Sequence, residues 1–199
     1  MRYRVVNKDR ARDSRDRLMA YLRLVHSNAT LATREGSCLD AFDRELDYLF
    51  ETLRRLGAHA WELEDLAQEV FIVLYRNWPS FDTTRPVQPY LFGVAFRIVS
   101  AHCRRRDREV PHPTPELEDE TADPEEALID KESFGLFIAA LERVPLRRRA
   151  VLILHDLDEV PIVEVARKLS LTRVGAYVRL RKARAELAAA VKRLLKEET

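Results

Sequence analysis

Basic and aromatic side chains gather in the segment from Thr172 to Arg184, and their spacing suits contacts with nucleic acid. From residue 165 to residue 196 there are ten Lys and Arg residues and one acid, Glu186, whereas the whole chain has a net charge of only +1. Charge sorted in this way is the electrostatic footprint of a phosphate-binding surface. The alternative is a solvated basic helix at the end of an α-helical protein. The candidate contact residues are Thr172, Arg173, Tyr177, Arg179, Arg181, Lys182 and Arg184.

Two helices separated by a short turn must position these side chains. The pattern predicts a short helix over 161–169, a turn over 170–172, and a long helix that follows. Thr172 is the predicted N-cap, because its hydroxyl can accept a hydrogen bond from an N–H group of the first turn. An apolar seam at helical spacing marks the buried side of the long helix: Ala176, Leu180, Ala183 and Leu187. This arrangement is typical of a helix-turn-helix, whose second helix enters the major groove of DNA.

A second candidate surface is acidic and lies in a predicted helix that begins near Leu63. Asp65, Gln68, Glu69 and Ile72 are spaced i, i+3, i+4 and i+7, so they share a face opposite the apolar stripe. One interpretation is an ordinary solvated face. The other is a docking surface for a basic partner helix, to which Ile72 adds an apolar contact.

A third candidate surface combines aromatic, basic and hydroxyl side chains. Trp78, Phe81 and Tyr90 flank the polar segment over 82–88, and the next helix exposes Phe92 or Phe96 beside Arg97. Such mixtures suit single-stranded nucleic acid, whose bases stack on aromatic rings. For any one of these aromatics, core packing is the simpler interpretation.

No pattern of residues indicates catalysis or a resident metal. The sequence has no Gly-rich phosphate loop, no His-Glu-x-x-His and no paired Cys-x-x-Cys. His102 and Cys103 are adjacent in a predicted helix, where neighbouring side chains point apart. We therefore expect no enzymatic activity, no cofactor, no metal and no small-molecule substrate.

Composition predicts an all-α fold with two small helical domains. The chain has 199 residues, five glycines and long stretches of Leu, Ala, Arg and Glu. From residue 109 to residue 130 there are nine acids, four prolines and no Lys or Arg, which predicts an extended acidic linker. The acidic charge of this linker has two interpretations. It keeps the protein soluble, or it shields the basic surfaces on either side. The predicted segments are 1–35 of unassigned role, a first domain over 36–108, a linker over 109–124, and a helix-turn-helix domain over 125–199.

The surroundings of the chain are also predicted. Two cysteines provide no disulfide framework, which favours a reducing cytosol. No apolar run is long enough to cross a bilayer, so we expect a cytoplasmic protein without membrane insertion.

Taken together, these motifs resemble the two-domain bacterial RNA polymerase sigma factors of the extracytoplasmic-function (ECF) group. In the first domain the resemblance rests on EDLAQEVFIVLYRNWPSFD (Glu64 to Asp82) and PYLFGVAFRIVSAHCRRR (Pro89 to Arg106). In the second it rests on ALERVPLRRRAVLILHDLDEVPIVEVARKLSLT (Ala140 to Thr172) and RLRKARAEL (Arg179 to Leu187).

The resemblance implies a division of labour between the domains. It implies that Asp65, Gln68, Glu69 and Ile72 dock on the clamp of the largest subunit of core RNA polymerase. It implies that the second domain touches the polymerase flap and reads the minus-35 promoter element. The implied minus-35 contacts are Thr172, Arg173, Tyr177, Arg179, Arg181, Lys182 and Arg184. The resemblance also implies that an anti-sigma protein binds this chain, and that the promoters it recognises belong to a stress- or signal-responsive regulon. The implied minus-10 contacts are Phe81, Thr83, Thr84, Arg85, Gln88, Phe96, Arg97, Ser100 and Arg104.

This chain departs from the family pattern in both DNA-contacting regions. Phe96-Arg97 replace the usual Arg-Asn, and Ser170 replaces a usual Gly in the turn. A serine there costs about 1 kcal/mol if its φ is positive. Residues 175–178 have fewer polar side chains than usual, which predicts an atypical minus-35 sequence. Two other functions stay open: a helix-turn-helix regulator that dimerises and binds DNA without polymerase, and a sigma mimic that binds only an anti-sigma protein.

Overall fold

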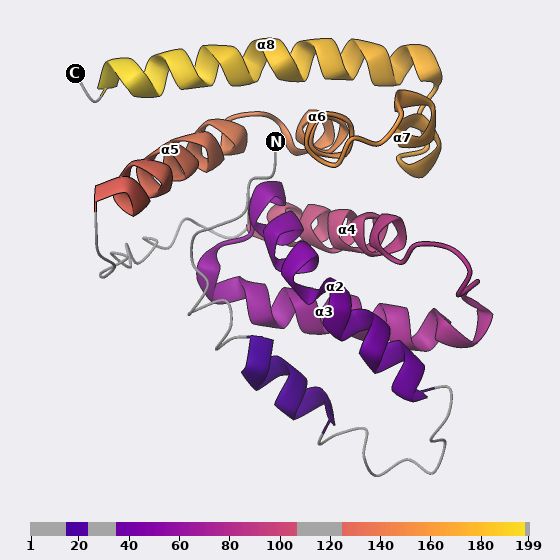
Figure 1. Cartoon of the computed structure of the whole chain (residues 1–199). Coiled ribbons are helices and arrows are strands. Elements are labelled where there is room, and N and C mark those ends of the chain that lie inside the picture. Colours follow the sequence, from indigo (N-terminus) through magenta and orange to yellow (C-terminus); the bar gives the residue numbers. More distant parts are fainter. Residues whose placement is uncertain (1–14, 24–34, 107–124, 198–199) are drawn as a thin grey trace. The chain divides into compact units, whose positions relative to one another are not determined.

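The computed structural model describes residues 15–23, 35–106 and 125–197 (Figure 1). Every regular element within these residues is a helix, which confirms the predicted all-α class. The contacts divide the chain into two compact units, with the division between Val99 and Ser100. The predicted acidic linker over 109–124 lies outside the described residues.

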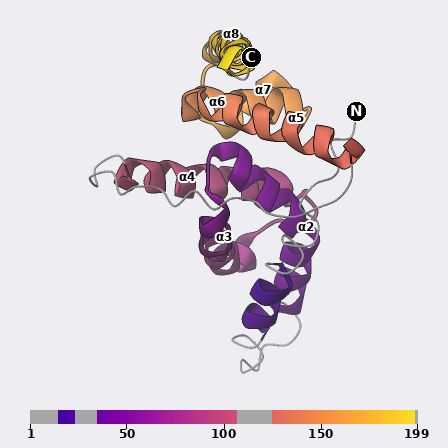
Figure 2. The ribbon, with the colours of Figure 1, turned by 90° about the vertical axis from the view of Figure 1, so that its left-hand side faces the viewer.

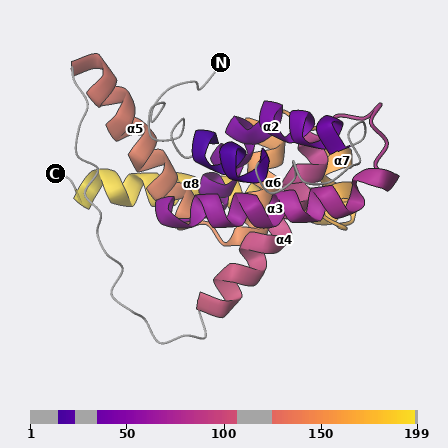
Figure 3. The same cartoon turned by 90° about the horizontal axis from the view of Figure 1, so that it is seen from below.

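The N-terminal unit is built around two long helices that run side by side (Figure 3). These are α2 (Glu35–Leu56) and α3 (Leu63–Asn77), with the short 3-10 helices η1 (Ala60–Glu62) and η2 (Trp78–Ser80) next to α3. Phe42 of α2 meets Phe71 of α3 edge to face, with 4.9 Å between ring centroids. Gly57 follows the last residue of α2 with a φ of 99°, a left-handed conformation that glycine commonly adopts at the C-terminal end of a helix. Helix α4 (Gln88–Arg106) follows, and the division between the units falls within it, after Val99. The part of α4 in the N-terminal unit buries Leu91, Phe92, Val94, Ala95 and Val99.

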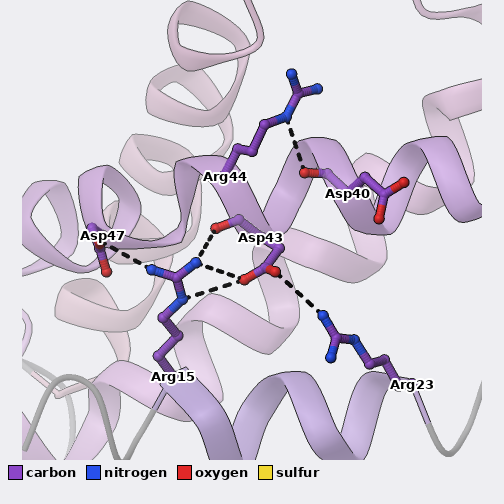
Figure 4. A network of polar contacts seen from close by, with 6 residues as sticks. All are labelled: Arg15, Arg23, Asp40, Asp43, Arg44 and Asp47. Carbon is purple, nitrogen blue, oxygen red and sulfur yellow. Dashed lines mark hydrogen bonds and ion pairs between the residues drawn. The ribbon is translucent and has the colours of Figure 1, made fainter.

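A helix over residues 15–23 precedes α2, in a segment whose structure the sequence pattern did not predict. Its apolar side chains Leu18, Met19 and Leu22 are buried. Arg15 fastens it to α2, because its guanidinium donates to Asp43 Oδ1 at 2.9 Å and to Asp47 Oδ2 at 3.1 Å (Figure 4). Arg23 adds a longer contact of 3.4 Å to the second oxygen of Asp43.

The C-terminal unit places one long helix along several shorter ones (Figures 1 and 2). Helix α8 (Arg173–Glu197) packs against α5 (Glu125–Glu142), α6 (Leu146–Leu152) and α7 (Ile162–Lys168). Helix α6 continues directly as a π-helical turn, η3 (Ile153–Leu157). Arg149 of α6 is buried and caps α5, because its guanidinium donates to the carbonyl oxygens of Glu142 and Val144.

The helix-turn-helix has the predicted geometry at its turn. Helix α7 ends one residue earlier than predicted, at Lys168, and α8 begins at Arg173. Thr172 is the N-cap, since its Oγ1 accepts a hydrogen bond of 3.0 Å from the N–H of Gly175. A Cβ atom at Gly175 would lie 3.0 Å from that Oγ1, so a larger residue would crowd the cap. Ser170 has a φ of 54°, the positive value that makes glycine the usual residue at this point.

We expect Ser170→Gly to stabilise the C-terminal unit by up to about 1 kcal/mol, because glycine adopts a positive φ without the steric cost that serine incurs. Urea unfolding followed by circular dichroism measures this change in the free energy of unfolding. Ser80→Gly is the matched control, since Ser80 does not have a positive φ and its replacement should destabilise. A destabilised Ser170→Gly variant would contradict the assignment of strain to this turn.

Candidate functional site

Four residues of α3 form the acidic face that the sequence predicted. Asp65, Glu69 and Ile72 are exposed and Gln68 is partly exposed, while Leu66, Val70 and Phe71 are buried on the other side of the helix. Ile72 retains 39% of its surface, so its apolar side chain is accessible beside the two carboxylates. The face therefore offers two carboxylates and an apolar contact to another molecule.

Trp61 lies one turn before Asp65. It was not among the residues predicted for the acidic face. Its indole is 46% exposed and stacks on the His59 ring, with 4.4 Å between the centroids. His59 is itself held in a capping box, where its N–H donates to Glu62 Oε2 at 2.9 Å. Exposed tryptophans are enriched among the residues that dominate binding energy at protein interfaces. A tryptophan four positions before the acidic residues is the feature of the sequence that could have identified it.

Three aromatic rings fasten the ends of the loop between α3 and α4. Phe81 stacks on Trp78, with centroids 5.4 Å apart, and meets the edge of Tyr90, also at 5.4 Å. Trp78 is buried, and Phe81 and Tyr90 are partly exposed. Phe81 was predicted as a nucleic-acid contact, but in this arrangement its ring is engaged in packing that holds the loop in place.

Asp82 orders the polar residues within that loop. Its Oδ1 accepts hydrogen bonds from the N–H and the hydroxyl of Thr84, at 3.1 and 2.6 Å, and its Oδ2 pairs with Arg85 at 3.0 Å. These bonds, those to Thr84 first, lower the pKa of Asp82 below its ordinary value. The ionised carboxylate that makes them is therefore retained at neutral pH and lost only as the pH falls through this lowered pKa.

Other polar residues of the third candidate surface are divided between exposed and buried positions. Gln88 donates to Glu45 Oε2 at 2.8 Å, and Thr83 and Thr84 are exposed in the loop. On α4, Arg97 and Arg104 are exposed and Phe96 is partly exposed. Phe92, the alternative to Phe96, is buried in the core.

Ser100 differs from the prediction, because its Oγ is buried and does not reach the surface. Its side chain is too short to extend past its neighbours as an arginine does. The accessible residues of this α4 face are thus Phe96, Arg97 and Arg104.

The first turns of α8 expose most of the predicted basic residues. Arg173, Tyr177, Arg181 and Lys182 are exposed, and Arg179 is partly exposed. The Arg173 guanidinium lies over the Tyr177 ring at 6.0 Å from its centroid, a cation–π contact that holds the two side chains together. Thr172 is exposed, although its hydroxyl is engaged as the N-cap.

Arg184 is exposed but paired within the same unit. Its guanidinium makes a two-bonded contact with Asp156, at 2.8 and 2.6 Å. This contact raises the pKa of Arg184 and offsets its positive charge. Among the basic residues predicted on α8, Arg184 is the one that forms an ion pair within the part of the chain that the structure describes.

Neither a metal centre nor a membrane helix is found in the part of the chain that the structure describes. No three metal-binding side chains are grouped there, and no helix there is both long and apolar enough to span a bilayer. Burial raises the pKa of the Cys38 thiol to about 12, so this cysteine is protonated and unreactive at neutral pH.

Comparison with known protein families decides the identity of the two units. The model of Sigma-70 region 2 matches residues 41–109, and the model of Sigma-70 region 4 matches residues 134–187. The chain is 24% identical to the ECF RNA polymerase sigma factor SigW of Bacillus subtilis over 159 residues. This alignment covers 74% of this chain and 85% of SigW. It belongs to the ECF sigma factors.

Further relatives and solved structures agree with this family. The ECF RNA polymerase sigma factor SigG of Mycobacterium tuberculosis is 27% identical over 166 residues, which cover 67% of this chain and 45% of SigG. The structure of CnrH in complex with the cytosolic domain of CnrY has the same fold, with a TM-score of 0.56 and 18% identity over 96% of this chain and 100% of that one. The sigma factor RpoE, crystallised with the anti-sigma factor NepR of Bartonella quintana, has a TM-score of 0.55 and 20% identity over 76% and 96%.

The Arg184–Asp156 pair leads to a prediction about how this sigma factor binds DNA. We expect Arg184→Gln to leave the salt dependence of DNA binding unchanged, because the balanced guanidinium displaces no counterion from phosphate. Lys182→Gln, at an exposed position of α8, should reduce the slope of log K against log salt by about 0.9, the value for one phosphate contact. Titrations of a labelled duplex at several salt concentrations measure both slopes. An equal reduction in the two variants would show that Arg184 leaves Asp156 to contact the DNA.

Proposed function

We propose that this sigma factor binds core RNA polymerase through the α3 face and directs initiation at promoters through surfaces on both units. The observation that carries the proposal is the exposure of an acidic α3 face in the Sigma-70 region 2 match and of a basic α8 face in the region 4 match. Asp65, Gln68 and Glu69 meet the polymerase clamp, and Ile72 adds apolar contact. The chain has no enzymatic activity of its own in this proposal and acts in the cytoplasm of a bacterium.

In the first domain, over 36–108, the loop between α3 and α4 captures the melted minus-10 strand together with the α4 face. The ordered turn around Asp82 presents hydroxyl and guanidinium groups, and Phe96 and Arg97 offer a ring and a charge to an unstacked base. Opening DNA sacrifices about 1.4 kcal/mol of stacking for every base step that melts, so the capture of one or two bases offsets only part of the total cost. A unit of this size therefore opens promoters only when it is held by the polymerase.

In the second domain, over 125–199, α8 enters the major groove of the minus-35 element. Arg173, Tyr177 and Arg181 contact base edges, while Arg179 and Lys182 contact phosphates. The cap at Thr172 and the turn at Ser170 fix the angle at which α8 leaves α7. The flap of the polymerase is the protein partner of this domain.

Regulation of this sigma factor is assigned to an anti-sigma protein. The proposal draws on the similar structure of the sigma factor RpoE in complex with the anti-sigma factor NepR. The other similar structure, CnrH, is likewise in complex with another protein, the cytosolic domain of CnrY. Sequestration until a stress or another signal arrives would restrict transcription to one set of promoters.

Run-off transcription on genomic fragments with bacterial core polymerase tests the proposal. With this protein present, new transcripts should start at a shared pair of promoter elements; without it, these transcripts should be absent. A dimer that binds an operator tightly without polymerase would instead identify a conventional helix-turn-helix regulator. Binding to an anti-sigma protein with no new transcript would identify a sigma mimic.

A further inference from the structure

The outward face of the first two turns of α8 is apolar at its centre. Val174, Val178 and Arg181 are spaced i, i+4 and i+7, so they share one face. Val174 is 72% exposed and Val178 41% exposed, and Tyr177 beside them is 48% exposed. The opposite face is buried, since Ala176, Leu180 and Ala183 pack toward the rest of the unit.

These apolar groups occupy the part of a helix-turn-helix that meets base edges. The N-terminal residues of the second helix lie deepest in the major groove, whereas later turns move away from the bases. Val174, Tyr177 and Val178 fall within the first six residues of α8. The fewer polar side chains of residues 175–178 predicted an atypical minus-35 sequence, and the residues predicted to contact DNA here were Arg173, Tyr177 and Arg181.

The charges around the apolar patch favour DNA over a protein as its partner. Arg173, Arg181 and Lys182 surround it and are exposed. The single acid of the segment, Glu186, pairs with Arg148 of α6 at 2.6 Å. The patch is thus surrounded by exposed positive charge, which complements the phosphates on both sides of a groove.

Within the major groove, thymine presents a distinctive apolar group at its base edge. Its C5-methyl contacts apolar side chains, whereas the other bases are read through hydrogen-bond donors and acceptors. A valine has neither a donor nor an acceptor in its side chain. Tyr177, held under the Arg173 guanidinium, adds the flat side of a ring to the same surface.

We propose that Val174, Tyr177 and Val178 read thymine methyl groups, so that the minus-35 element of this sigma factor contains thymines opposite the first two turns of α8. This inference rests on the proposed function, because it requires α8 to lie in the major groove. Arg173 and Arg181 supply the polar contacts at the edges of the patch, to guanine or to phosphate. The preference for thymine then depends on the burial of its methyl group against the apolar centre of this α8 face.

Substitution of thymine by deoxyuridine tests the inference, because it removes the methyl and leaves every hydrogen-bonding group of the base. The minus-35 region of a promoter is randomised, bound by the full chain together with core polymerase, and the enriched sequence is determined. Each contacted thymine is then replaced in turn. A contacted methyl should give about fourfold weaker binding when removed, the effect of one buried carbon.

Matched variants connect this loss to the two valines. Val174→Ser and Val178→Ser remove the methyl groups of each valine, and both positions are exposed, so the fold is retained. The double variant should lose most of the preference for the thymine duplex over the deoxyuridine duplex, because a serine side chain has no methyl group. Val163→Ser is the control: Val163 is 54% exposed but lies on α7, and its replacement should leave the preference for thymine intact.

The outcomes separate this inference from the proposed function. Enrichment of a sequence whose thymines tolerate deoxyuridine everywhere would overturn the reading of methyl groups and leave the sigma-factor proposal standing. Failure to enrich any sequence with polymerase would overturn both. Self-association of the full chain that the valine variants abolish, without any change in thymine preference, would show that the patch contacts a second copy and would also overturn the inference.

Discussion

Replacing Asp65 and Glu69 together by lysine is expected to weaken the binding of core RNA polymerase by at least about 100-fold. Both carboxylates are exposed on one face of α3, so their reversal leaves the core of the unit unchanged. A like charge placed opposite a basic partner costs several kcal/mol, and each 1.4 kcal/mol is a factor of ten in affinity. Fluorescence titration of labelled protein with core polymerase measures the change.

A charge reversal elsewhere on the same unit is the matched control. Asp40 is an exposed acid of α2, and Asp40→Lys should bind core polymerase normally. Trp61→Ala should weaken binding by itself if the exposed indole belongs to the interface. Normal co-purification of the Asp65→Lys, Glu69→Lys protein with core polymerase would refute the assignment of this face.

Replacement of Phe96 and Arg97 together by alanine should reduce promoter opening by about 5- to 150-fold, with core binding and duplex docking retained. The range corresponds to about 1–3 kcal/mol for one stacked base. The effect is confined to opening, because stacking on Phe96 and contact with Arg97 form only after the strands separate. Permanganate oxidation of thymines near the start site measures the opened fraction.

A template with a pre-melted bubble separates a defect in melting from a defect in folding. The bubble removes the need for opening, so transcription by the double variant should recover on it. Because Phe96 is partly buried, Phe96→Leu combined with Arg97→Ala serves as a second variant that keeps most of the side-chain volume while removing the ring. Normal opening by either variant, or no recovery on the bubble, would place the melting surface elsewhere.

Local patterns were sufficient to predict the parts of this fold that local contacts determine. The apolar stripe of α3, the apolar seam of α8 and the cap at Thr172 all depend on residues within a few positions of one another. The conformational cost of a serine at position 170 was predicted from its place in the turn, and the positive φ of 54° at Ser170 is the conformation that this cost requires. The predicted faces of α3 and α8 are exposed because each lies opposite an apolar seam.

Contacts between distant residues were beyond the reach of these patterns. The helix over 15–23 has only three buried apolar side chains, and its ion pair joins Arg15 to a residue 28 positions later. Arg184 meets Asp156 across the same separation, so its neutralisation could not be seen in a count of charges. The packing of Phe81 between Trp78 and Tyr90 likewise depends on how the loop closes.

The helix over 15–23 has a consequence for where this protein can be cut. The Sigma-70 region 2 match begins at residue 41, and a chain trimmed there would lack Leu18, Met19 and Leu22, together with the buried Cys38 at the start of α2. It would also leave Asp43 and Asp47, one turn apart on α2, without the arginine that bridges them. Such a fragment exposes apolar surface and adds repulsion between carboxylates. For this chain, the segment defined by sequence similarity is smaller than the unit held together by its contacts.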